Sequence, residues 1–190
     1  MTTLPEDLTY TVTYLEMMAR PARPQAPRPA LPIMLLRCDT PSVRFYRYLY
    51  ASVGDAWIWF ERRLMPEADL GAILAHPGVS LHVLHLAGEP VGYFELDRRD
   101  PPAFDLAYFG LVPEATGKRL GPWLLDQAIH QAFDEGAERL RVNTCTLDSP
   151  KALPMYQRAG FVPVAQVERT IRNPHQRMAE LPRPNRWIEI

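Results

Sequence analysis

The sequence is poor in cysteine, in net charge and in long apolar runs. Its 190 residues include only two cysteines, Cys38 and Cys145, which excludes a disulfide framework and indicates reduced core thiols of a cytoplasmic protein. The formal net charge of −1 argues against nucleic acid or an anionic membrane as the main partner. No apolar run approaches the ~20 residues of a membrane span, and the N-terminus lacks a secretory signal pattern. We therefore expect a cytoplasmic globular protein in which any basic site is local.

Proline, in contrast, is abundant and separates the N-terminal region from the rest of the chain. Tyr10, Val12 and Tyr14 alternate with threonines, which predicts a strand running to about Met18. The stretch 21–32 holds five prolines and is expected to be an extended spacer, with a proline-motif ligand as the alternative. We divide the chain into an N-terminal strand and spacer (1–32), one domain (33–173) and a C-terminal tail (174–190).

The remaining segments alternate between predicted strands and helices. Strands are predicted over 33–37, 79–86, 91–96, 104–112, 140–143 and 161–167, and helices over 42–52, 67–75, 121–135 and 150–159. Gly136 is the expected stop of the third helix, and Ser149 the expected cap of the fourth. Three strands joined by short turns form an antiparallel meander, and a strand–helix–strand unit follows. The order predicts an α/β (α+β) fold with a mixed, mostly antiparallel central sheet flanked by helices.

The most informative stretch is a glycine-bearing basic loop, 111–122, between a predicted strand and an amphipathic helix. Such a turn directs backbone N–H groups and the positive end of a helix dipole to one place, which suits a phosphate or pyrophosphate. Gly117 and Gly121 allow the main chain to approach an anion closely, and Lys118 and Arg119 add positive charge. By itself this pattern also occurs in ordinary loops.

A second pattern further along the chain completes a family resemblance. It runs from Ser149 through Ala152 and Tyr156 to Gly160 and Phe161. With the segment 116–121 before it, this order resembles the GNAT superfamily of N-acetyltransferases, which carries Arg/Gln-x-x-Gly-x-Gly/Ala and then Asn-x-x-Ala-x-x-x-Tyr-x-x-x-Gly-Phe. The resemblance covers roughly residues 79–167, and it is specific because two separate patterns occur at the right separation.

Several positions depart from the family pattern. Thr116 stands where Arg or Gln is usual, and Arg119 where glycine is usual, which matters if the backbone there needs a positive φ. Any non-proline residue still offers its N–H, and the Arg119 side chain can itself contact a phosphate. Ser149 replaces the usual Asn, and Pro154 is expected to distort the last helix.

The resemblance implies that acetyl-CoA is the co-substrate and that its acetyl group passes directly to an amine. The residues implied to bind it are Phe109, Gly110, Leu111, Val112, Thr116, Gly117, Lys118, Arg119, Leu120, Gly121, Asn143, Ser149, Ala152 and Tyr156. The strand residues would offer free main-chain groups beside a splayed neighbouring strand, with a bulge at Gly110. N–H groups near Leu111 would polarise the thioester carbonyl.

Three residues are candidates for proton transfer. Tyr156 matches the family tyrosine that protonates the departing thiolate, although by residue type alone a tyrosine filling the seam between helix and sheet is the alternative. Asp105, where relatives often carry Glu, is the candidate base, directly or through water, and Glu95 on the neighbouring strand is the fallback. A solvated strand-end carboxylate is an equal alternative for Asp105, and no strong base is needed if the amine arrives neutral.

The acceptor is expected beside the aromatic-rich stretch 45–60, which in relatives walls the acceptor cleft. Trp57 and Trp59 are the candidate substrate-binding residues, whereas Tyr46 and Tyr50 share one helical stripe and are expected in the core. The histidine spacing indicates no metal site. The acceptor is a small-molecule or protein amine.

The prediction is therefore an acetyl-CoA-dependent N-acetyltransferase acting on a primary amine. A catalytically silent GNAT-fold module that binds acyl-CoA, as a sensor or interaction domain, is the alternative. A nucleotide-binding fold is weaker, because the glycines lack Walker or Rossmann spacing. The long spacer would suit a homodimer built by exchange of the N-terminal strand.

Overall fold

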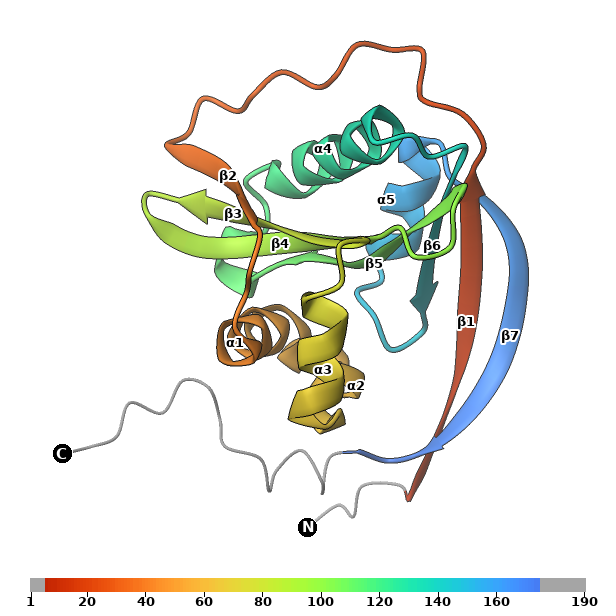
Figure 1. Cartoon of the computed structure of the whole chain (residues 1–190). Helices are drawn as coiled ribbons and strands as arrows, with labels where there is room; N and C mark the ends of the chain where they lie inside the picture. The colour runs from red at the N-terminus through yellow and green to blue at the C-terminus, as the bar shows by residue number, and fades with distance from the viewer. Residues whose placement is uncertain (1–5, 175–190) are drawn as a thin grey trace, which may run out of the picture.

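The computed structural model describes residues 6–174, which form one seven-stranded sheet with helices on both faces (Figure 1). The strands are β1 (Asp7–Met17), β2 (Ile33–Cys38), β3 (Val79–Leu86), β4 (Glu89–Asp97), β5 (Ala103–Leu111), β6 (Arg139–Cys145) and β7 (Val162–Arg172). The helices are α1 (Val43–Gly54), α2 (Glu61–Leu64), α3 (Glu67–Leu74), α4 (Leu120–Asp134) and α5 (Ala152–Ala159). Apart from residue 174, the predicted tail 174–190 lies outside the described residues.

The sheet has the order β2-β3-β4-β5-β6-β1-β7 and is antiparallel except between β5 and β6. Strands β3, β4 and β5 form the expected meander, and helix α4 then carries the chain to β6, which runs parallel to β5. A parallel neighbour requires a crossover of this length, since a tight hairpin joins only antiparallel strands. The mixed, mostly antiparallel sheet flanked by helices confirms the predicted fold class.

The N-terminal strand β1 lies inside the sheet, between β6 and β7. It pairs antiparallel with both, so that Val12 lies opposite Cys145 on one side and Tyr10 opposite Arg169 on the other. Its alternating side chains therefore contribute to the same faces as those of β6. The strand pairs within its own chain, and it supplies a wall of the molecule close to the end of β6.

The proline-rich spacer is extended, as expected, and crosses the outer side of α4 (Figure 1). The backbone N–H of Ala26 donates to the Asp126 carboxylate at 2.6 Å, and Arg23 forms an ion pair with the same carboxylate at 2.5 Å. Arg20 adds an ion pair to Asp134 at 2.5 Å. Because Asp126 is almost fully buried, the ion pair with Arg23 and the hydrogen bond from Ala26 offset the cost of burying its carboxylate. The spacer thus connects β1 to β2 along α4.

One apolar cluster lies on each face of the sheet. Helices α4 and α5 cover one face, and α1, α2 and α3 lie on the other (Figure 1). Tyr46 and Tyr50 belong to the second cluster and are 0% and 1% exposed, which confirms their predicted place in the core. Cys38 and Cys145 are free, as expected, and both are half-buried; Cys38 packs against the second cluster, whereas Cys145 belongs to neither.

The structure corrects two local predictions and adds one helix that was not predicted. Helix α5 begins at Ala152 with Lys151 as its N-cap residue, and the Ser149 hydroxyl instead accepts a hydrogen bond from the Lys151 N–H at 3.4 Å. Pro154 lies in the first turn of α5, where an N–H has no partner within the helix, so it need not distort the helix. The sequence analysis also missed α2, because four residues are too few to show a helical period.

Candidate functional site

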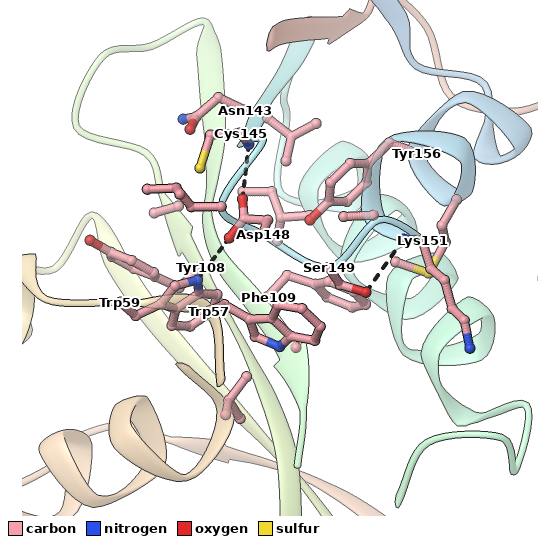
Figure 2. Close-up of a pocket in the computed structure, with 18 of the residues that line it drawn as sticks. Trp57, Trp59, Tyr108, Phe109, Asn143, Cys145, Asp148, Ser149, Lys151 and Tyr156 are labelled. Atoms are coloured by element: carbon pink, nitrogen blue, oxygen red, sulfur yellow. Dashed lines mark hydrogen bonds between the residues drawn. The ribbon is translucent and has the colours of Figure 1, made fainter. Parts of the chain in front are cut away.

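The sheet opens between its two parallel strands. Strands β5 and β6 pair only where residues 103–105 face 139–141, and they separate from Leu106 and Val142 onward. A cavity of ≈ 850 Å³ lies at this opening, lined by both strands, by β1, by the segment 57–62 and by the start of α5 (Figure 2). Beyond the paired part, β5 has no neighbour on its β6 side, so main-chain groups there are available to a ligand.

Gly110 is required by packing against α1, not by a bulge. The bulge between β4 and β5 falls at Ala107, whereas Gly110 pairs in regular register with Tyr93. A Cβ at Gly110 would lie 2.3 Å from Cγ1 of Val53, which is closer than any real contact. The predicted bulge at Gly110 is therefore wrong, and the glycine is explained by close approach of helix α1.

The turn into α4 offers unsatisfied backbone donors. Among the described residues, none of the N–H groups of 117–121 donates a hydrogen bond, and α4 has no side-chain cap. Gly117 and Arg119 adopt positive φ values of +79° and +60°. Arg119 therefore adopts the left-handed conformation that the glycine of the family pattern would adopt without strain, at a cost of about 1 kcal/mol. A strained turn of free amides before a fifteen-residue helix is an anion-binding arrangement.

The residues predicted to bind acetyl-CoA fall into two groups. Those that line the cavity are Phe109, Gly110, Leu111, Thr116, Gly117, Arg119, Gly121, Asn143, Ser149, Ala152 and Tyr156. Outside the cavity lining, Leu120 is fully buried in the core, Lys118 hydrogen-bonds the Glu114 carbonyl, and the Val112 N–H donates to the Val91 carbonyl at 2.9 Å. The cavity thus brings most of the predicted set together, and the Val112 amide is already used within the sheet.

Tyr156 projects from α5 into the cavity (Figure 2). Its ring packs edge-on against Phe109 and Phe161, with 5% of the residue exposed, and its hydroxyl bonds no other described residue. Burial raises the pKa of the Tyr156 phenol, and the nearby Asp148 carboxylate raises it further. The phenol is therefore protonated at neutral pH and can donate its proton in the cavity.

The two predicted carboxylates lie in different surroundings. Asp105 lines the cavity where β5 and β6 separate, and Arg141 binds both of its oxygens at 2.8 and 2.7 Å. Glu95 is fully buried and lies outside the cavity lining, where it accepts hydrogen bonds from Tyr46 at 2.5 Å and Arg62 at 2.9 Å. Burial raises the pKa of Glu95, and its partners oppose this. Of the two, only Asp105 is in contact with the cavity.

The predicted aromatic residues form one wall of the cavity. Trp57 and Trp59 both line it, and Trp59 packs with Tyr50 and Tyr108 at ring-centroid distances of 5.2 and 5.4 Å. Gly54 permits this packing, because a Cβ there would lie 2.4 Å from Cβ of Trp59. The sequence analysis did not single out Tyr108, whose position on β5 beside this cluster depends on the folded sheet.

The analysis of the sequence also missed Asp148, in the turn between β6 and α5. Its Oδ1 accepts a hydrogen bond from the Trp59 indole N–H at 3.0 Å. Its Oδ2 accepts from the Thr144 hydroxyl at 2.9 Å and from the Cys145 N–H at 3.0 Å. The available signal in the sequence was the adjacent Ser149, which belongs to the family pattern. Only folding brings Asp148 into contact with Trp59.

The cavity lies where the sheet opens between two parallel strands, beside an uncapped glycine-bearing turn, so it can hold an extended ligand along a strand edge with an anionic group at the turn. The model of the acetyltransferase (GNAT) family matches residues 35–161, more than half of the chain. The chain therefore belongs to the GNAT acetyltransferase family, which confirms the resemblance found in the sequence.

Solved structures share the fold at low sequence identity. A GCN5-related N-acetyltransferase from Kribbella flavida matches with a TM-score of 0.55 and 19% identity, over 86% of this chain and 58% of that one. One from Sphaerobacter thermophilus matches with a TM-score of 0.58 and 15% identity, over 86% and 51%. The chain thus spans little more than half the length of these structures.

A further match is an aminoglycoside acetyltransferase from an uncultured soil metagenomic sample, in complex with sisomicin. Its TM-score is 0.56 with 13% identity, over 68% of this chain and 88% of that one. No curated protein matches the sequence.

Two further observations concern membranes and metals. Within residues 6–174 no helix is long and apolar enough to cross a bilayer. In the same part of the chain, no three His, Cys, Asp or Glu side chains gather where they could hold a metal ion.

Proposed function

We propose that this protein transfers an acetyl group from acetyl-CoA directly to a primary amine. The observation that carries the proposal is the open edge of β5 beside the free amides of 117–121, with the Tyr156 phenol facing the same cavity. The amides and the Arg119 guanidinium suit a pyrophosphate, and the unpaired edge of β5 suits an extended amide-bearing arm. Membership of the GNAT family supports acetyl-CoA as the donor.

The proposed reaction needs no metal ion and no redox partner. The ammonium of the acceptor first loses a proton, and its nitrogen then attacks the carbonyl carbon of the thioester. N–H groups near Leu111 stabilise the negative charge that develops on the carbonyl oxygen. The carbon–nitrogen bond forms, the carbon–sulfur bond breaks, and Tyr156 gives its proton to the departing thiolate. The second proton of the amine restores the phenol, so one proton is released to solvent for each turnover.

Asp105 is proposed to accept the first proton through water. It is the carboxylate at the point where β5 and β6 separate, and its two hydrogen bonds from Arg141 fix its orientation. Glu95 is not proposed as a base, because Arg62 and Tyr46 occupy its oxygens outside the cavity. Its buried pairing instead supports the aromatic wall, since Arg62 lies 5.2 Å from the centre of the Tyr108 ring.

The remaining features of the proposal concern the surroundings of the reaction. The acceptor is a small-molecule or protein amine that enters along the aromatic wall of Trp57 and Trp59. We place the protein in the cytoplasm on the basis of its two free cysteines. Any homodimer is proposed to form without exchange of β1, because this strand pairs within its own chain.

Isothermal titration with acetyl-CoA and with CoA tests the donor site. A Cβ at Gly121 would make only ordinary contacts of 3.7 Å, so Gly121→Ala is a matched control for Gly121→Glu. We expect Gly121→Glu to weaken binding much more strongly than Gly121→Ala, because only glutamate places a negative charge beside the pyrophosphate. Thiol release in a screen of amines then tests turnover. Binding without release for any amine would favour the silent acyl-CoA-binding module.

A further inference from the structure

Asp148 is a carboxylate held rigidly in the cavity. Three donors on two segments far apart in the sequence bind it: the indole of Trp59, and the hydroxyl of Thr144 and the backbone N–H of Cys145 at the end of β6. A carboxylate has about four acceptor positions, so one position on Oδ1 is left for a ligand. Such a network fixes the orientation of the carboxylate before any acceptor binds, which lowers the entropic cost of using it.

Asp148 lies between the aromatic wall and the proposed proton donor. Figure 2 shows Asp148 between Trp59 and Tyr156. This position agrees with the hydrogen bond from Trp59 to Asp148, and with the effect of the Asp148 carboxylate, which raises the pKa of the Tyr156 phenol. The acceptor nitrogen must reach the thioester carbon near Tyr156 from the side of the aromatic wall. A carboxylate at this boundary is therefore placed to meet the reacting end of the acceptor.

The charges around the cavity leave Asp148 without a cationic partner. Among residues 6–174, the ion pairs that involve cavity residues are Arg62–Glu95, Asp97–Arg99 and Asp105–Arg141, and none includes Asp148. Glu61, which accepts a hydrogen bond from Tyr108 at 2.9 Å, also lines the cavity without an ion pair. The cation on the β7 side, Arg169, hydrogen-bonds the Tyr14 hydroxyl at 2.8 Å. Arg119 and Lys151 line the opposite, donor side.

We propose that Asp148 binds the positively charged amino group of the acceptor, and that the acceptor class is an alkylammonium with an apolar or aromatic body. The inference rests on the proposed function and names its substrate class. The free position on Oδ1 accepts one N–H of the ammonium, and the rings of Trp57 and Trp59, which line the cavity, cover the adjoining carbon atoms. The same aromatic wall excludes water, which strengthens the attraction between the carboxylate and the ammonium.

Benzylamine and benzyl alcohol are probes that test this site without turnover. They have the same ring and nearly the same size, but at pH 7 only benzylamine carries a positive charge. Each is titrated into the complex of the full chain with CoA. A charge-assisted hydrogen bond predicts that benzylamine binds at least about tenfold more tightly than benzyl alcohol. Equal affinity, or no binding of either probe at millimolar concentration while CoA is bound, would overturn the proposal.

Variants connect this preference to Asp148. Asp148→Asn should bring the two affinities together by weakening benzylamine binding, with benzyl alcohol and CoA binding unchanged. Trp59→Phe keeps an aromatic ring at position 59 and leaves the Asp148 carboxylate in place, so it should retain the preference for benzylamine. Asp69→Asn, at an exposed position of α3, is the control for the loss of a surface carboxylate. A preference that survives in Asp148→Asn would assign the charge recognition to another residue. The wild-type comparison stands even if Asp148→Asn fails to fold.

The outcome separates this inference from the proposed function. Thiol release from acetyl-CoA with any amine supports the transferase, whether or not Asp148 recognises charge. Turnover combined with equal binding of the two probes would refute only the role of Asp148. Charge-dependent binding without turnover would support the role of Asp148 as a cation-binding residue and would refute the transferase.

Discussion

Removal of one hydroxyl group, in Tyr156→Phe, should separate catalysis from folding in this protein. The hydroxyl of Tyr156 has no hydrogen-bonding partner among the described residues, and the ring packs against Phe109 and Phe161. Phenylalanine preserves this packing, so the free energy of unfolding should change by less than about 1 kcal/mol. Affinity for CoA should also be retained, because the hydroxyl is not part of the turn at 117–121.

The rate should fall, because the thiolate then leaves without a proton donor. General acid catalysis contributes about 10²- to 10⁴-fold. An alkyl thiol has a pKa of about 8.5 and is a fair leaving group at neutral pH, so the lower end applies. We expect kcat to fall about a hundredfold, which corresponds to about 2.7 kcal/mol of lost transition-state stabilisation.

The assay follows release of the CoA thiol with the best acceptor from the amine screen, together with urea unfolding of each variant. Tyr48→Phe on α1 is the matched control, because Tyr48 stacks on Phe45 and lies outside the cavity lining. It should leave both the rate and the stability unchanged. A Tyr156→Phe rate within about twofold of the wild type would refute the role of the phenol as proton donor.

Three further perturbations test the support around the cavity. Gly110→Ala should destabilise the fold by about 1–3 kcal/mol through overlap with Val53, and Val53→Ala in the same chain should recover part of this loss in urea unfolding. Glu95→Gln should cost about 3 kcal/mol in the same measurement, because it leaves the buried guanidinium of Arg62 without its counter-ion; a loss below about 1 kcal/mol would contradict this. Burial lowers the pKa of His82 to about 4, so the unfolded chain binds a proton more readily below pH 6.5. Stability should therefore fall by up to about 3 kcal/mol as the pH drops from 6.5 to 4, and His82→Gln should remove this part of the pH dependence.

The elements and the family could be predicted from the sequence because their signals are local. The alternation in 10–14, the helical stripe of 121–135 and the glycine at 136 each depend on a few neighbouring residues, and the structure places β1, α4 and the turn after it there. The two family patterns likewise occupy short stretches, and most of their residues line one cavity. Tyr156, for example, belongs to the second pattern and lines this cavity.

The tertiary structure alone decided which distant segments meet. Nothing within residues 7–17 specifies that β1 inserts between β6 and β7, because strand partners are chosen by the whole sheet. The same holds for Asp148, which meets Trp59 across 89 positions of the chain, and for Glu95, whose burial beside Arg62 removes it from the cavity. Local patterns thus determined the elements and the family of this protein, whereas long-range packing decided which carboxylates line the cavity, because a side chain's surroundings come from residues far away in the sequence.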